Sequence, residues 1–176
     1  MSRSRQLAVI MFTDIVGYTA LMGNDEEKGL RILNKNRELQ RPIIEELKGR
    51  WIKELGDGVM ASFNTVSDAV NAAIRIQTES DAIPNLQLTI GLHLGEVIFE
   101  NEDVFGDGVN IASRIQAFAV PGSIYVSEAI HNNISNKQGI ETKFVKQEKL
   151  KNVAFPIRID EVITAHKKDS KVSSTE

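Results

Sequence analysis

The order of its predicted strands and helices constrains the fold of this chain more than any other feature. An apolar segment rich in β-forming residues occupies residues 7–12, and a helical pattern of apolar residues follows over residues 25–48. Strand-like segments at residues 51–55 and 59–63 then flank Gly56-Asp57-Gly58, a sequence typical of a hairpin turn. Strands and helices therefore alternate without the regular βα repeat of a parallel sheet.

The rest of the chain continues this mixture. The further predicted elements are helices at residues 66–79, 109–119 and 127–134, and strands at residues 86–94, 96–100, 123–126, 144–148 and 157–162. We expect Gly95 to turn a hairpin between two of these strands, and Asp107 to cap the helix that begins at residue 109. The fold class predicted is α+β, a ferredoxin-like sandwich in which helices cover a mostly antiparallel sheet.

Composition narrows the classes of function. The 176 residues carry a net charge of −3, which gives no electrostatic reason to expect a nucleic-acid partner or contact with a membrane surface. The chain has no cysteine, so disulfides, thiolate catalysis and cysteine-based zinc sites are excluded. We predict a domain at residues 6–164, between a short extension at residues 1–5 and a polar, disordered tail at residues 165–176. No signal peptide or membrane span is predicted, so the cytoplasm is the expected location.

The segment from residue 103 to residue 114 is rich in polar groups with defined spacing. Asp103 lies in a loop, and Asn110 and Arg114 follow four residues apart on the predicted helix. Residues four apart share one helix face, so the amide and the guanidinium point the same way. An amide can orient a hydroxyl group, and the guanidinium fork matches a phosphate. Both side chains could equally be ordinary polar residues on a solvated face.

Two aspartates lie beside glycines at the ends of predicted strands. Asp14 ends the first strand and is followed by a tight loop that contains Gly17 and Thr19. A carboxylate there can hold Mg²⁺, while backbone amides of small residues meet phosphate oxygens. Asp57 lies in the predicted hairpin turn. Each also has a plain structural role, since aspartate caps turns and Asp-Gly suits a type I′ turn.

Lys53 lies within the predicted strand at residues 51–55. Strand alternation places it on the same face as Trp51 and Leu55, which points it inward. An inward lysine needs a partner, either a ligand or a buried acid. The alternative is a lysine in solvent on an edge strand.

Taken together, these segments resemble one family, the class III adenylate/guanylate cyclase catalytic domain. The resemblance covers about residues 6–163. It rests on Phe-Thr-Asp-Ile-Val-Gly-Tyr-Thr at residues 12–19, Lys-Glu-Leu-Gly-Asp-Gly at 53–58, Gly-Leu-His-Leu-Gly-Glu-Val at 91–97, Asp-Val-Phe-Gly-Asp-Gly-Val-Asn-Ile-Ala-Ser-Arg at 103–114, and the ending at 150–162. Several ordered motifs with the correct spacing identify the family where no single one would.

The resemblance implies a role for each site residue. Asp14 and Asp57 match the two metal-binding aspartates, with the carbonyl of Ile15 as a further ligand. Lys53 and Asp103 match the pair that reads the purine. The remaining matches are Asn110 to the asparagine that orients the ribose, Arg114 to the arginine on the transition-state phosphate, Gly17, Tyr18 and Thr19 to the turn near the β- and γ-phosphates, and Lys151, more loosely, to a triphosphate-binding lysine.

Hydrogen-bonding chemistry then selects the purine. Adenine offers N1 as an acceptor and its N6 amino group as a donor, so Lys53 can donate to N1 and Asp103 can accept from N6. Guanine reverses both groups, and a site built for one pattern rejects the other because buried polar groups remain unpaired. ATP is therefore the expected substrate.

The implied reaction is attack of the ribose 3′-oxygen on the α-phosphorus, which gives cyclic AMP and pyrophosphate. The resemblance implies two ions of Mg²⁺ or Mn²⁺ for each site and a homodimer with shared active sites. It also implies that a sensor or regulatory domain accompanies such a catalytic domain.

Three alternatives belong to neighbouring classes. A guanylate cyclase is disfavoured by Lys53 and Asp103. A silent nucleotide-binding module would be signalled by loss of Asp14, Asp57, Asn110 or Arg114, and all four are present. A diguanylate cyclase would carry Gly-Gly-Asp-Glu-Phe, which this sequence lacks.

Overall fold

The computed structural model describes residues 3–137 and 139–164. In these parts of the chain the strands are β1 (Arg3–Ile15), β2 (Arg50–Leu55), β3 (Gly58–Phe63), β4 (Leu88–Glu100), β5 (Asp103–Phe105), β6 (Ile124–Ser127), β7 (Glu141–Glu148) and β8 (Ile157–Ile163). The helices are α1 (Tyr18–Asn24), α2 (Glu26–Glu46), α3 (Val66–Ser80), α4 (Asp107–Phe118) and α5 (Glu128–Ile134). The tail predicted at residues 165–176 lies outside the described residues. Within them, no helix combines the length and apolar character that crossing a membrane requires.

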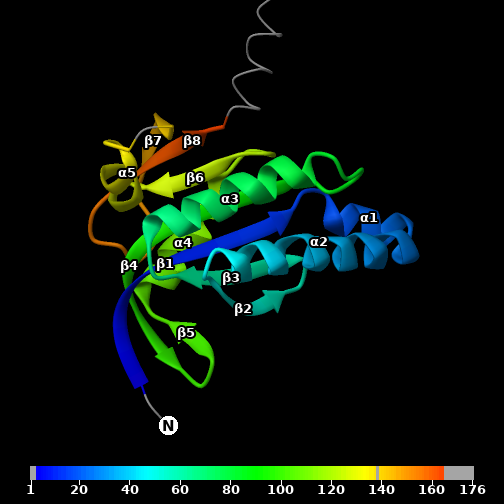
Figure 1. Ribbon diagram of the computed structural model, residues 1–176, viewed down its shortest axis with the longest axis horizontal. Helices are drawn as coiled ribbons and strands as arrows, with labels where there is room; N and C mark the ends of the chain where they lie inside the picture. Colours follow the sequence, from blue (N-terminus) through cyan, green and yellow to red (C-terminus); the bar gives the residue numbers. More distant parts are fainter. Residues whose placement is uncertain (1–2, 138, 165–176) are drawn as a thin grey trace, which may run out of the picture.

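One sheet joins all the strands. Its order is β2-β3-β1-β4-β6-β8-β7, and β5 pairs with β4 outside this path (Figure 1). Every pair is antiparallel except β4 with β6, which is parallel. The prediction of an α+β fold with a mostly antiparallel sheet is therefore confirmed.

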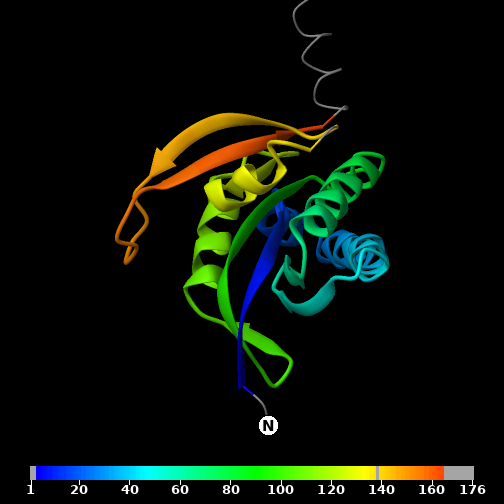
Figure 2. The ribbon, with the colours of Figure 1, turned by 60° about the vertical axis from the view of Figure 1, so that its left-hand side comes forward.

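Helices cover the two faces of this sheet. Figure 2 shows α2 and α3 on one side of β1 and β4, and α4 on the other. The larger apolar core lies between the sheet and α2 and α3, and it includes Val9, Ile44 and Ile76. A second core lies under α4 and includes Ile10 and Ala112. The sheet is thus buried on both sides at its centre, which explains the continuous apolar run of β1.

β1 and α2 form where the sequence predicts them. β1 begins earlier than predicted, at Arg3, and it pairs with β3 on one side and with β4 on the other. α2 begins after Asp25, whose carboxylate accepts a hydrogen bond of 3.1 Å from the amide of Lys28. Pro42 lies inside α2 without ending it. Because Thr13 near the end of β1 pairs with Val59 at the start of β3, the end of β1 lies beside the β2–β3 turn.

The hairpin predicted through Gly95 is wrong. β4 continues without a break through this glycine, and the chain turns at Asn101 and Glu102, both with positive φ. Gly95 leaves room for His93, because a Cβ there would lie 2.7 Å from Nε2 of that side chain, and one of the two would have to shift. A glycine inside a strand can mark such a close approach.

Two local predictions at helix starts are also corrected. The residues after Gly17 do not form a loop: Gly17 adopts a left-handed conformation and Tyr18 begins the helix α1. Asp107 does not cap α4, since Gly106 takes the N-cap position and Asp107 is the first helical residue. An acid in the first turn still stabilises the helix through the helix dipole. Asp107 therefore marks the start of α4 as predicted, but from the position after the N-cap.

Candidate active site

Two carboxylates meet where β1 ends beside the β2–β3 turn. Asp14 and Asp57 are hydrogen-bonded to each other, and the amide of Ile15 donates to Oδ2 of Asp57 over 3.3 Å. Burial, the hydrogen bond with Asp57 and the repulsion between the two acids raise the pKa of Asp14 to about 7. Two acids that need a proton between them form a natural position for a cation.

A hollow of about 630 Å³ opens beside this pair. The described residues that line it include Asp14, Ile15, Val16, Gly17, Tyr18, Thr19, Ala20, Asp57, Thr89, Gln116, Ala117 and Ala119. The predicted phosphate-facing residues Gly17, Tyr18 and Thr19 therefore do lie next to the two acids. No lysine or arginine is among these lining residues, so the charge of the hollow is negative.

The donor set of this hollow fits a hard divalent cation. Mg²⁺ and Mn²⁺ prefer carboxylate and carbonyl oxygens, and Mg²⁺ is usually held by one or two carboxylates together with substrate phosphates. Across residues 3–137 and 139–164, no group of three or more histidine, aspartate or glutamate side chains is placed to hold a metal. Asp14 and Asp57 could hold such an ion, with the remaining ligands from backbone, substrate or water.

Sequence reasoning missed two polar residues in the same hollow. Thr89 is the partner of Asp14 in the β1–β4 register, and its hydroxyl accepts a hydrogen bond of 2.7 Å from the amide of Gln116. Thr89 is one of three polar residues in the segment at residues 86–94, with Gln87 and His93, and nothing in the sequence distinguishes it from them. The pair of Thr89 and Gln116 links α4 directly to the strand that faces Asp14.

Lys53 and Asp103, the two residues predicted to read the purine, form an ion pair. Nζ of Lys53 lies 2.9 Å from Oδ2 of Asp103, and the two side chains are 41% and 29% exposed. The other oxygen of Asp103 accepts the amide of Val104 at 2.7 Å. Burial of Asp103 opposes ionisation, but the hydrogen bonds from Lys53 and Val104 and the charge of Lys53 lower its pKa overall. A donor and an ionised acceptor therefore lie side by side.

The predicted orientation of Lys53 is wrong. A bulge interrupts the β2–β3 register between Trp51 and Lys53. Trp51 packs on the core under α2 and α3, whereas Ile52 packs on the core under α4 and Lys53 reaches Asp103 on β5. An extra residue in one strand reverses the facing of the residues after it, so simple alternation fails.

A third group lies at α4 and the loop before β8. Asn110 and Arg114 line one hollow of about 140 Å³ together with Lys151, Asn152 and Val153, among other residues. Both α4 residues are exposed. The prediction that the amide and the guanidinium point the same way fits this placement, and Lys151 adds a second cation.

The structure therefore divides the predicted site residues among three places. The acidic hollow holds Asp14, Asp57 and the residues after them, and the hollow at α4 holds Asn110, Arg114 and Lys151. The two hollows share no lining residue, and Lys53 and Asp103 line neither. Within one chain, the two acids and the cations Arg114 and Lys151 thus line different hollows.

Comparisons with known proteins give a consistent result. A family model described as the adenylate and guanylate cyclase catalytic domain matches residues 1–164. A Rhizobium meliloti protein named as a candidate adenylate cyclase is 34% identical over 163 residues, covering 88% of this chain and 28% of that protein. An Anabaena cylindrica adenylate cyclase is 28% identical over 186 residues, covering 90% of this chain and 37% of that protein.

A solved structure agrees with these relatives. It is titled as an adenylate/guanylate cyclase/hydrolase from Silicibacter pomeroyi, and it is 32% identical to this chain with a TM-score of 0.85. The similarity covers 92% of this chain and 99% of that chain. By contrast, the chain spans only about a third of the length of the two curated relatives.

Proposed function

This chain belongs to the adenylate and guanylate cyclase catalytic domain family, and from that premise we propose that it converts ATP to 3′,5′-cyclic AMP and pyrophosphate. The family description covers both purines, so the choice of ATP needs its own support. The observation that carries it is the 2.9 Å pair of Lys53 and Asp103, a hydrogen-bond donor beside an acceptor.

Lys53 and Asp103 would bind the base through the hydrogen-bonding groups that their contact with each other leaves free. An ammonium group has three donors and a carboxylate accepts several hydrogen bonds, so both side chains can bind a base while contacting each other. Lys53 would donate to N1 of adenine, and Asp103 would accept from the N6 amino group. The low pKa of Asp103 supports this role, because only the ionised carboxylate is a pure acceptor.

The sugar and the phosphates would meet the other two groups. Asn110 would orient the ribose so that its 3′-oxygen faces the α-phosphorus, and Arg114 would meet the charge that develops on the phosphate. Lys151, which shares their hollow, would bind the triphosphate. When bound at Asp14 and Asp57, with the carbonyl of Ile15, two ions of Mg²⁺ or Mn²⁺ would lower the pKa of the 3′-hydroxyl and neutralise the triphosphate.

We further propose that the active form is a homodimer. The acidic hollow contains no cation from the described lining residues, while Arg114 and Lys151 lie in a separate hollow. A two-fold pair of chains would bring the acids of one chain against the cations and the purine-reading pair of its partner, twice. The curated relatives are also much longer than this chain, which supports regulation by a further domain.

Two other functions remain as outcomes of a test. Guanylate cyclase activity would require the base to be read by residues other than Lys53 and Asp103. A nucleotide-binding module without turnover would keep the same fold and release no product.

The deciding experiment is incubation of the purified chain with ATP or GTP and either Mg²⁺ or Mn²⁺, followed by identification of products. We expect cyclic AMP and pyrophosphate from ATP, little product from GTP, and none after chelation of the metal. Asp14→Asn should remove the activity from a folded protein. Cyclic GMP as the main product would overturn the substrate assignment, and nucleotide binding without product would favour the silent module.

A further inference from the structure

β2, the strand that carries Lys53, is an edge strand of the sheet. It lies at one end of the sheet order, and among the described strands it pairs only with β3. A strand with backbone hydrogen bonds along one edge alone also depends on side-chain contacts for its position. The position of Lys53 therefore depends on what holds β2 from elsewhere.

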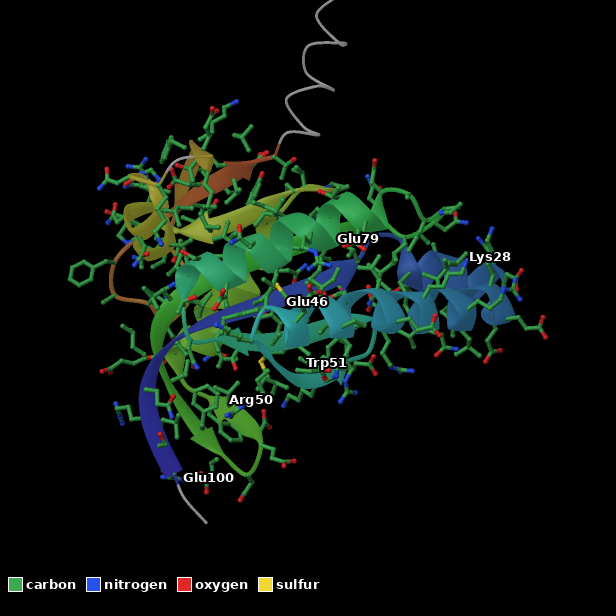
Figure 3. The ribbon with its side chains drawn as sticks, viewed as in Figure 1. Lys28, Glu46, Arg50, Trp51, Glu79 and Glu100 are labelled. Atoms are coloured by element: carbon green, nitrogen blue, oxygen red, sulfur yellow. The ribbon has the colours of Figure 1, made fainter. Side chains whose placement is uncertain are left out.

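After the bulge in β2 the register is regular, so the neighbouring side chains of Lys53 and Glu54 point to opposite faces of the sheet. Lys53 points toward Asp103 on the side of α4. Glu54, the next residue, reaches α2 on the other side, where it meets Arg37. The ring of Trp51, which is labelled in Figure 3, lies 5.6 Å from the guanidinium of Arg41 on α2.

The contact between Arg37 and Glu54 is bidentate. Nε of Arg37 donates to Oε1 of Glu54 at 2.8 Å, and NH2 donates to Oε2 at 2.9 Å. A third hydrogen bond of 3.1 Å, from NH1 to Oδ1 of Asn34, braces the guanidinium against its own helix. Two parallel bonds fix an orientation as well as a distance, which a single ion pair does not.

We propose that Arg37 and Glu54 are positioning residues for purine selection: they anchor the edge strand to α2 and so hold Lys53 against Asp103. The inference rests on the proposed role of Lys53 in reading the base. Neither Arg37 nor Glu54 lines either of the two hollows, so both would act through Lys53.

Loss of this anchor should affect recognition of the base more than turnover. Glu54→Gln and Arg37→Gln each break the fork but leave the acids, Asn110 and Arg114 in place. We expect the KM for ATP to rise about fivefold, with a similar fall in the preference for ATP over GTP and a kcat within about twofold of wild type. Where GTP is not turned over, its Ki against ATP replaces its kcat/KM.

Partial and reciprocal variants test the geometry. Arg37→Lys keeps the charge but not the fork, so its effect should be intermediate. The exchange of Arg37→Glu with Glu54→Arg should recover part of the selectivity that either single variant loses.

A matched control comes from the contact between α2 and α3. Arg75 pairs with Glu46 at 3.0 Å and with Glu79 at 3.5 Å, and its side chain is 42% exposed, as is that of Arg37. Figure 3 labels Glu46 on α2 and Glu79 on α3. Glu46→Gln should therefore change stability without changing base preference. If Glu54→Gln lowers the melting temperature as Glu46→Gln does but leaves selectivity unchanged, the bridge serves stability alone and the inference is wrong.

The position of Lys53 can also be tested without turnover. Its acylation by a dilute amine-reactive ester, followed by peptide mass spectrometry, should be faster in Glu54→Gln than in wild type and unchanged in Glu46→Gln. An unchanged rate in Glu54→Gln contradicts the inference whatever the activity. Unchanged selectivity in Lys53→Met would instead contradict the proposed reading of the base, so the two failures are distinguishable.

Discussion

The surroundings of two aspartates in the candidate site shift their pKa values in opposite directions. Burial and Asp57 raise the pKa of Asp14 to about 7, whereas Lys53 and the amide of Val104 lower that of Asp103 against the effect of burial. Asp103 is thus ionised on its own and can accept a hydrogen bond from a base. A cation beside Asp14 would lower its raised pKa and favour the ionised carboxylate, which suits a metal ligand.

Arg114 provides the first prediction at this scale. Arg114→Ala should lower kcat by about 10²–10³ and change KM much less, because its fork would meet charge that forms only in the transition state. Steady-state kinetics with ATP measures both values. Arg31→Ala, which removes an exposed arginine of α2, is the control and should leave kcat unchanged. A rise in KM alone would make Arg114 a ground-state phosphate contact.

His93 provides a second prediction, on stability against pH. Burial lowers its pKa to about 4, and its Nδ1 has no hydrogen-bond partner. Between about pH 6.5 and pH 4 the unfolded chain binds a proton that the folded chain excludes, so this residue makes stability fall as pH falls. From pH 7 to pH 5 the loss due to His93 should be about 1–2 kcal/mol.

The measurement is the difference between wild type and His93→Gln in urea unfolding at the two pH values, without added metal. Asp14 acts in the opposite direction, since its raised pKa adds stability that is lost as pH rises toward 7. Subtracting the variant removes this and other shared contributions. Equal losses in the two proteins would show that His93 is already protonated in the folded state or absent from the balance.

At the scale of elements, the central contact is that of α4 with β4. A Cβ on Gly91 would lie 2.4 Å from the backbone nitrogen of Gln116, and a Cβ on Gly108 would lie 2.9 Å from the carbonyl oxygen of Glu96. Strand and helix backbones therefore approach closely at both ends of α4. This close packing of α4 on β4 sets the positions of Asn110 and Arg114.

Gly91→Ala tests this packing. The new methyl group meets helix backbone, which cannot rotate away, so α4 must shift, at a cost of about 1–3 kcal/mol in stability. We expect kcat to fall by about tenfold to a hundredfold at temperatures where the variant is fully folded. Gly23→Ala in α1 is the control, because a Cβ there meets nothing within 4 Å. Wild-type kcat in a destabilised Gly91→Ala would show that the site tolerates movement of α4.

Local sequence patterns predicted most helices and strands but not the irregular positions within them. The strand at 7–12, the helices before and after the first hairpin, and the final strand pair all follow from periodicity and turn residues. Gly95 was misread as a turn because a glycine that makes room for a neighbouring side chain looks the same in sequence. The bulge before Lys53 leaves no local signal either, since it depends on how β2 meets two separate cores.

Some residues of the candidate site could likewise be predicted from the sequence, and others could not. Family motifs indicated Asp14, Asp57, Lys53 and Asp103, and the structure places them in contact as two separate pairs. Their roles stay predictions. Thr89 and Gln116, like Arg37 and Glu54, could not be found from sequence because each pair joins segments far apart in the chain.

At the scale of the whole molecule, the separation of acids from cations carries the last prediction, which concerns assembly. Asp14→Asn and Arg114→Ala damage different halves of the proposed shared site. In a mixture of the two inactive proteins, heterodimers should hold one intact site, while the other site carries both lesions. Equal mixing makes about half of the dimers heterodimers, so activity per chain should recover to about one quarter of wild type.

The matched control is a mixture of Asp14→Asn with Asp57→Asn. Both lesions then affect the acidic hollow, so every site of every dimer lacks one acid and no activity should return. Subunit exchange is verified with differently tagged chains before the assay. Since the two acids and Arg114 line different hollows of one chain, recovery in the first mixture alone requires sites built from two chains. Equal inactivity of both mixtures after verified exchange would mean that each site is completed within one chain.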